Sequence, residues 1–216
     1  MSARRSLPVL FFLLLATGCG SLAKVDYAGL MTGGRDGWQR PAEVIDALAL
    51  AAGDRVAEIG AGDGYWLPWL SEAVGATGVV YAVEVEEDKV RALEEKLSKE
   101  PLANVMVVLG EYADPKLPDG AIDLAMTCLT YHHIEDREAY FARLRTDLAP
   151  GGRVAHLDDH ADVPLPIRWI QGDHVSDPDE IVAEMATAGY ERTGAWDFLP
   201  FQSYQQFEPV RADSAR

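Results

Sequence analysis

The chain predicts an α/β protein with a doubly wound, mostly parallel sheet of seven strands. Short apolar runs alternate with segments of helical periodicity, which is the order expected for parallel strands joined by crossover helices. The runs are continuously apolar, so both faces of the sheet are expected to be buried. With 216 residues, 48% of them hydrophobic, the chain is long enough for one such domain.

Local signals place the elements of the first half. Pro41 suits the first turn of a helix, where its missing N–H costs little, and Pro68 does the same for the next helix. The expected helices cover residues 41–51, 65–74 and 89–97, and the expected strands cover residues 55–59, 79–83 and 104–109.

Caps and turns place the elements of the second half. Asp136 is a capping residue for one helix, and Asp177 opens another that ends at Gly189. Strands are expected over residues 121–127, 153–157, 190–198 and 201–207, with helices over residues 136–148 and 177–189. Right-handed crossovers bring the carboxyl ends of the parallel strands to one edge, where ligands of such sheets bind.

A glycine-rich turn, Glu58-Ile59-Gly60-Ala61-Gly62-Asp63-Gly64, joins the first strand to the helix that follows. Glycines allow a ligand to approach the backbone closely, and the helix start offers unpaired N–H donors. The dinucleotide pattern G-x-G-x-x-G is not met, because Tyr65 stands where it requires Gly, which disfavours a nicotinamide oxidoreductase. A plain tight turn is the alternative to a cofactor site.

Glu84 ends the second expected strand. A carboxylate at this place in a nucleotide-binding α/β fold accepts hydrogen bonds from ribose hydroxyls. The alternative is a solvated acid at the start of the acidic helix that follows.

The spacing E-x-G-x-G-x-G resembles the first motif of the class I S-adenosylmethionine (SAM) dependent methyltransferases. Leu148-Ala149-Pro150-Gly151-Gly152-Arg153 and Ala188-Gly189-Tyr190 are similar to further family motifs, so the resemblance covers residues 38–209. It implies a Rossmann-like methyltransferase fold with an antiparallel last strand. It also implies that SAM is the cofactor and that a methyl group is transferred to an unidentified small-molecule acceptor.

The resemblance also assigns the cofactor residues. Around the amino acid end of SAM it places Glu58, Gly60, Gly62 and Gly64, with Glu84 at the ribose and Gly110 and Glu111 at the adenine. Family members often carry Asp near Glu111, and a solvated loop acid is the alternative for this residue.

Tyr131, His132 and His133 are expected to end the fourth strand, beside the methyl group of SAM, and are the candidate catalytic residues. Histidine titrates near neutrality and can take a proton from an acceptor. Adjacent side chains on a strand diverge, so at most one His is expected to face the methyl group. The alternative is that they only pack or begin a helix. Asp158 and Asp159, after the fifth strand, are placed to orient a histidine or a substrate, or lie in a solvated loop.

Residues 1–18 have the pattern of a secretory signal peptide, with Arg4 and Arg5, a short apolar run and small residues before Cys19. This ending resembles a bacterial lipobox, so Cys19 is expected to be lipidated and to anchor the protein to the membrane on the periplasmic face of the envelope. Gly20 after it favours the outer membrane by the same resemblance. Residues 19–39 are then a tether and residues 40–210 the domain. Ordinary secretion or a misassigned start is the alternative.

The composition limits the classes of binding partner and metal that we expect for this chain. The formal charge of −16 repels phosphate backbones, so a nucleic-acid partner is not expected. Two cysteines are too few for a thiolate zinc site, and adjacent histidines rarely chelate an ion alone, so no metal is expected. Because SAM is made in the cytoplasm, a lipid-anchored, non-catalytic binding protein is the alternative to an enzyme.

Overall fold

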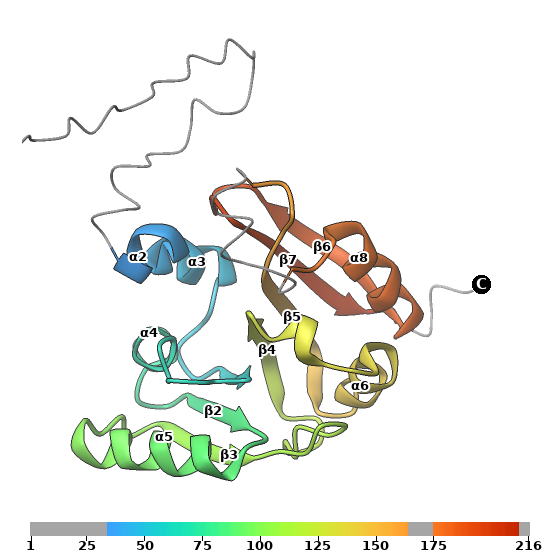
Figure 1. Ribbon diagram of the computed structural model, residues 1–216. Helices are drawn as coiled ribbons and strands as arrows, with labels where there is room; N and C mark the ends of the chain where they lie inside the picture. Colours follow the sequence, from blue (N-terminus) through green and yellow to red (C-terminus); the bar gives the residue numbers. More distant parts are fainter. Residues whose placement is uncertain (1–33, 164–174, 212–216) are drawn as a thin grey trace, which may run out of the picture.

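A computed structural model describes residues 34–163 and 175–211, which form a seven-stranded sheet with helices on both faces (Figure 1). The strand order is β3-β2-β1-β4-β5-β7-β6. The strands are β1 (Arg55–Ile59), β2 (Val79–Glu84), β3 (Val105–Leu109), β4 (Ile122–Cys128), β5 (Leu148–Asp159), β6 (Tyr190–Trp196) and β7 (Gln202–Pro209). Pairing from β3 to β5 is parallel, and β7 is antiparallel to both β5 and β6. The predicted fold class is confirmed.

Two apolar cores lie between the sheet and its helices. Alternate strand residues point to opposite faces, so Val56 joins one core and Ala57 the other. The core that contains Val56 is completed by α3 (Pro41–Leu48), α4 (Leu67–Val74) and α5 (Glu87–Lys99). The core that contains Ala57 is completed by α6 (Arg137–Leu144) and α8 (Pro178–Thr187).

Several element boundaries differ from the prediction. Part of the expected tether forms the helix α2 (Gly34–Gln39), whose Gln39 is buried. β5 begins earlier than expected because Leu148 already pairs with Ile122, ahead of a register shift. Tyr131–His133 form the short 3-10 helix η2 rather than the end of a strand.

The N-terminal segment, including Cys19, lies outside the described residues. Within the described ranges, no helix is both long and apolar enough to cross a membrane.

His156 of β5 is a fully internal histidine. Its side chain is 1% exposed, its Nδ1 lies 2.8 Å from Oγ1 of Thr127, and its Nε2 lies 3.4 Å from Sδ of Met185. The rings of Tyr131 and Phe141 pack against it edge-on. Burial disfavours the charged ring and lowers the pKa of His156 to about 3.

This lowered pKa predicts a loss of stability in mild acid. The unfolded chain takes up a proton near pH 6.5 while folded His156 resists it down to about pH 3, so protonation favours unfolding between these values. The contribution of neutral, buried His156 to the free energy of unfolding is fully present above about pH 6.5. Below that pH it falls by up to about 1.4 kcal/mol per pH unit. Urea unfolding from pH 7 to pH 4 measures this slope. His156→Gln does not titrate, so its curve should be flatter, and parallel curves would contradict the assignment.

Candidate functional site

A cavity of about 500 Å³ lies at the carboxyl ends of β1, β2 and β4, at the predicted edge of the sheet. Its wall includes the glycine loop after β1, Glu84 at the end of β2, and Thr130 and His133 after β4. Arg35 of α2 and Glu111 after β3 also line it. Elements far apart in sequence therefore meet around one space.

The glycine loop exposes its backbone to this cavity. Gly60 and Gly62 have φ values of 75° and 58°, in the left-handed region that favours glycine. A Cβ on Gly60 would overlap the side chain of Thr130, whereas one on Gly62 would meet only the Gly60 carbonyl oxygen, at 3.9 Å. Gly60 is thus required for packing within the protein, while Gly62 leaves open space above the loop.

Glu84 holds this loop in place. Its Oε1 accepts a hydrogen bond from the Gly62 N–H at 2.6 Å, and its Oε2 accepts one from the Val85 N–H at 3.3 Å. Glu84 is 5% exposed and lines the cavity. It therefore has both a structural partner and access to a ligand.

Glu58 is a buried carboxyl group with unused hydrogen-bonding capacity. Its side chain is 2% exposed, and its Oε2 has no hydrogen-bond partner among the described residues. Burial raises the pKa of Glu58 well above its ordinary value, although the positive charge of Arg35 opposes the shift. A buried oxygen of this kind beside a cavity indicates a donor supplied by a ligand.

Arg35 was not predicted as a site residue. Its Nη1 lies 3.2 Å from Oδ1 of Asp63, and its guanidinium carbon lies 3.9 Å from the ring centroid of Tyr65. Tyr65 in turn donates a hydrogen bond to Asp36 at 2.6 Å. These contacts hold α2 across the glycine loop. The sequence of this segment has no periodicity that could have placed it there.

Two of the predicted glycines lie behind the cavity instead of in its wall. A Cβ on Gly64 would come within 2.9 Å of both Leu67 and Leu93, so this glycine allows the helices to pack. Gly110 lies against Val83 in the same way. Glu111 does line the cavity, where its Oε1 lies 3.1 Å from Nζ of Lys116.

The chain turns sharply after β4, at Leu129, which has a φ of 55°. Thr130 then lies over Gly60, and His133 reaches the cavity wall. Tyr131 points into the core, where its hydroxyl donates to Oε2 of Glu184 at 2.5 Å. Of the three candidate catalytic residues, the structure thus places Tyr131 away from the cavity.

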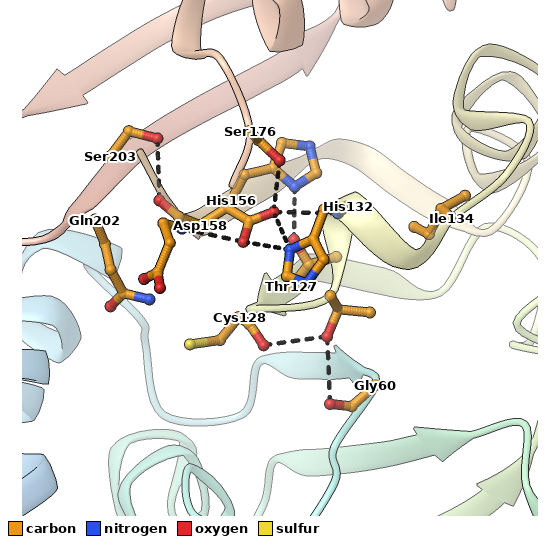
Figure 2. Close-up of polar contacts among 12 residues, drawn as sticks. Gly60, Thr127, Cys128, His132, Ile134, His156, Asp158, Ser176, Gln202 and Ser203 are labelled. Carbon is orange, nitrogen blue, oxygen red and sulfur yellow. Dashed lines mark hydrogen bonds and ion pairs between the residues drawn. The ribbon is translucent and has the colours of Figure 1, made fainter. Parts of the chain in front are cut away.

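His132 turns toward β5 and meets Asp158, as Figure 2 shows. Its Nδ1 lies 2.9 Å from Oδ1 of Asp158, whose carboxylate is completely buried. Asp158 also accepts a hydrogen bond from the Ser176 hydroxyl at 2.9 Å. An acid after β5 therefore does orient a histidine, one of the two roles that the sequence left open.

Metal ligands do not cluster in the part of the chain that the structure describes. Residues 34–163 and 175–211 contain no group of three or more His, Cys, Asp or Glu side chains arranged to hold an ion.

Comparison with known proteins identifies a domain. A family model for a methyltransferase domain matches residues 56–152. Nocamycin O-methyltransferase of Saccharothrix syringae is 31% identical over 51% of this chain and 40% of its own length. The 27-O-demethylrifamycin SV methyltransferase of Amycolatopsis mediterranei is 32% identical over 55% of this chain and 43% of its own. The chain thus spans less than half the length of these two relatives.

Solved structures extend the similarity beyond the matched segment. A SAM-dependent methyltransferase from Aquifex aeolicus has a TM-score of 0.70 and 26% identity, and the match covers 77% of this chain and 88% of that one. A putative sarcosine dimethylglycine methyltransferase from Galdieria sulphuraria, 13% identical with a TM-score of 0.65, shares the fold. Residues 56–152 therefore match a methyltransferase domain, and the predicted resemblance to the class I SAM-dependent methyltransferases, with SAM as cofactor, is confirmed.

Proposed function

We propose that this protein is an enzyme that transfers a methyl group from SAM to a small-molecule acceptor. Bound SAM supplies an electrophilic methyl group on a positively charged sulfur. The observation that carries the proposal is the buried Glu58 Oε2, which has no partner among the described residues and lies in the wall of the same cavity as Gly62. The cavity thus places a buried carboxyl oxygen of Glu58, which can accept a hydrogen bond from a ligand, beside the glycine backbone at Gly62, which no described side chain covers.

The other residues of the wall fit the remaining groups of SAM. Arg35 and Glu58 offer a cation and a carboxyl group to its amino acid end, which carries both charges. Oε1 of Glu84 accepts one hydrogen bond from Gly62. The carboxylate has further lone pairs that can accept hydrogen bonds from ribose hydroxyls. The protein's own part in the reaction is to align the acceptor with the methyl group and to exclude water.

The relatives support a small-molecule acceptor. Two relatives at 31% and 32% identity are named for methylation of nocamycin and of a rifamycin, and another, from Geobacillus, is a demethylmenaquinone methyltransferase. The formal charge of −16 supports the same class, since it disfavours nucleic acid.

Calorimetry of the purified protein with SAM, S-adenosylhomocysteine and NAD tests the cofactor site. We expect the first two to bind and NAD to bind far more weakly. Gly62→Val should abolish binding, because its side chain enters the open space over the loop. Glu84→Ala should weaken binding by roughly 1.5–3 kcal/mol, the scale of lost charge-assisted hydrogen bonds.

Gly120→Val is a matched control for the glycine variant. Gly120 has a φ of 62°, close to that of Gly62, and a Cβ there meets nothing within 4 Å. It precedes β4, at the opposite edge of the sheet, so the control carries a similar backbone strain without touching the cavity. Wild-type affinity in both Gly62→Val and Glu84→Ala would show that SAM binds elsewhere. Binding of SAM without transfer to any acceptor would favour the non-catalytic alternative.

We also propose that the mature protein begins at a lipidated Cys19 and is anchored in the bacterial envelope, at the outer membrane. The support is the order of Arg4 and Arg5, the apolar run and the small residues before the cysteine. An anchor of this kind would hold the domain at the membrane surface.

Expression of Cys19→Ser in a bacterial host tests the anchor. The wild-type protein should partition into detergent and carry the mass of a lipid at Cys19. The variant should remain a longer, unlipidated precursor, because the acylated atom is missing. A wild-type protein that begins at Met1 and has no lipid mass would rule the anchor out.

A further inference from the structure

We propose that two copies of this chain pair along β3, antiparallel to each other, and form one continuous sheet across a two-fold axis at Val107. The inference concerns a surface that takes no part in methyl transfer, so it does not rest on the proposed function. It starts from a difference between the two strands that end the sheet, β3 at one edge and β6 at the other (Figure 1).

β6 is protected against pairing with another chain. It exposes the charged residues Glu191 and Arg192, and its pairing with β7 shifts in register between Arg192 and Gly194. Charges and irregular pairing are the means by which natural edge strands prevent contact with other edges. β3 has neither, because its five residues are all apolar and its pairing with β2 is regular.

The outer edge of β3 offers backbone groups to a partner. The carbonyl of Asn104 and the N–H of Gly110, at the two ends of the strand, both bond to β2. Backbone groups alternate in direction along a strand, so Val105, Val107 and Leu109 turn theirs away from β2. Within the described ranges β3 pairs with β2 alone, and Val107 and Leu109 make no backbone hydrogen bond outside the sheet.

Apolar side chains are also exposed along β3. Met106 is 55% exposed, Leu109 48%, and Tyr112, just after the strand, 73%. The physical reason lies in residues 110–121, which connect β3 to β4 without a helix. The face of β3 that carries Met106 therefore lacks the cover that α5 gives to the other face. An apolar edge exposed in this way is suited to pairing with a second strand.

The strand is complementary to itself. Full overlap of two antiparallel copies places Val107 opposite Val107 of the second copy, and Leu109 opposite the second copy's Val105. The two Val107 residues then exchange a pair of hydrogen bonds, and each Leu109 N–H donates to the facing Val105 carbonyl. On the uncovered face, Met106 of each copy packs against Val108 of the other, as a cross-strand apolar pair.

Electrostatics favour this edge over the rest of the surface for contact between two copies. The formal charge of −16 makes two copies repel each other, but residues 101–110 contain no charged side chain. Two flanking carboxylates are neutralised within the chain, since Glu95 lies 2.6 Å from Lys99 and Glu111 lies 3.1 Å from Lys116. Pairing at β3 therefore brings few unpaired carboxylates together.

The arrangement leaves both cofactor cavities open. The carboxyl ends of the two paired β3 strands point in opposite directions, so the two cavities lie at opposite edges of the joined sheet. The two-fold axis is perpendicular to the sheet, so both copies present α3, α4 and α5 on the same side. A common side for both copies is also compatible with the proposed lipid anchor.

Sedimentation equilibrium of the full chain, in a detergent that matches the buffer in density, tests the pairing. The wild-type protein should have the mass of two chains and dissociate on dilution. Met106→Lys should raise the dissociation constant of the dimer roughly tenfold or more, because lysine opposes edge pairing and enters a symmetric interface twice. Val107→Pro should act likewise, since it removes the N–H at the axis. Proline is tolerated on edge strands, so the single chain should still fold.

Thr193→Lys is the matched control. Thr193 is exposed on β6, so the variant adds the same charge to the other edge and should leave the dimer unchanged. Urea unfolding checks that all three variants fold. A wild-type protein that is monomeric at every concentration would overturn the inference. So would a dimer that resists both Met106→Lys and Val107→Pro, or one that Thr193→Lys weakens equally. A dimer that does not bind SAM would overturn the proposed function and leave this inference intact.

Amide hydrogen exchange followed by NMR tests the register without any variant. The N–H groups of Val107 and Leu109 should exchange slowly in concentrated protein and rapidly once dilution separates the copies. Those of Met106 and Val108 bond to β2, so they should stay slow throughout. Rapid exchange at Val107 and Leu109 at every concentration would overturn the inference. Slow exchange at both in the separated chain would overturn it too, because another part of the same chain would then cover the edge.

Discussion

The hydrogen bond from the Gly62 N–H to Oε1 of Glu84, 2.6 Å long, is the constraint on which the site depends. It ties the loop after β1 to the end of β2 and keeps the loop backbone turned toward the cavity. Thr130 then fits over Gly60, where a side chain would overlap it. Arg35 of α2 contacts the same loop, because its Nη1 lies 3.2 Å from Oδ1 of Asp63. The loop therefore also helps to hold α2 in position.

Two buried carboxyl groups serve the site in opposite ways. Asp158 is satisfied by protein donors, so it is rigid and acts on the ring of His132. Glu58 has an oxygen without a partner among the described residues, and burial raises its pKa. A buried polar group that lacks a partner is costly, and a ligand that supplies a donor removes this cost. The first group is therefore suited to positioning and the second to binding.

The three residues after β4 show how a local turn separates neighbours. Leu129, with a φ of 55°, turns the chain just after β4, and the short 3-10 helix begins two residues later, at Tyr131. Tyr131 then enters the core, His132 meets Asp158, and His133 reaches the cavity. The expectation that neighbouring side chains diverge was made for a strand. On this different element Tyr131 does separate from the histidines, but the rings of His132 and His133 stay 4.1 Å apart.

The sequence by itself determined the order of strands along the chain and the glycine turn after the first strand. It also placed the carboxyl groups of Glu58 and Glu84 at the ends of the first two strands. These features could be predicted because periodicity and turn chemistry are local. Tertiary structure decided what depends on distant contacts. It placed Arg35 at the site although its segment has no pattern, and it assigned Gly64 and Gly110 to packing because their neighbours come from other elements. It also joined His132 to Asp158, 26 residues away, since only the parallel pairing of β4 with β5 brings those two strand ends together.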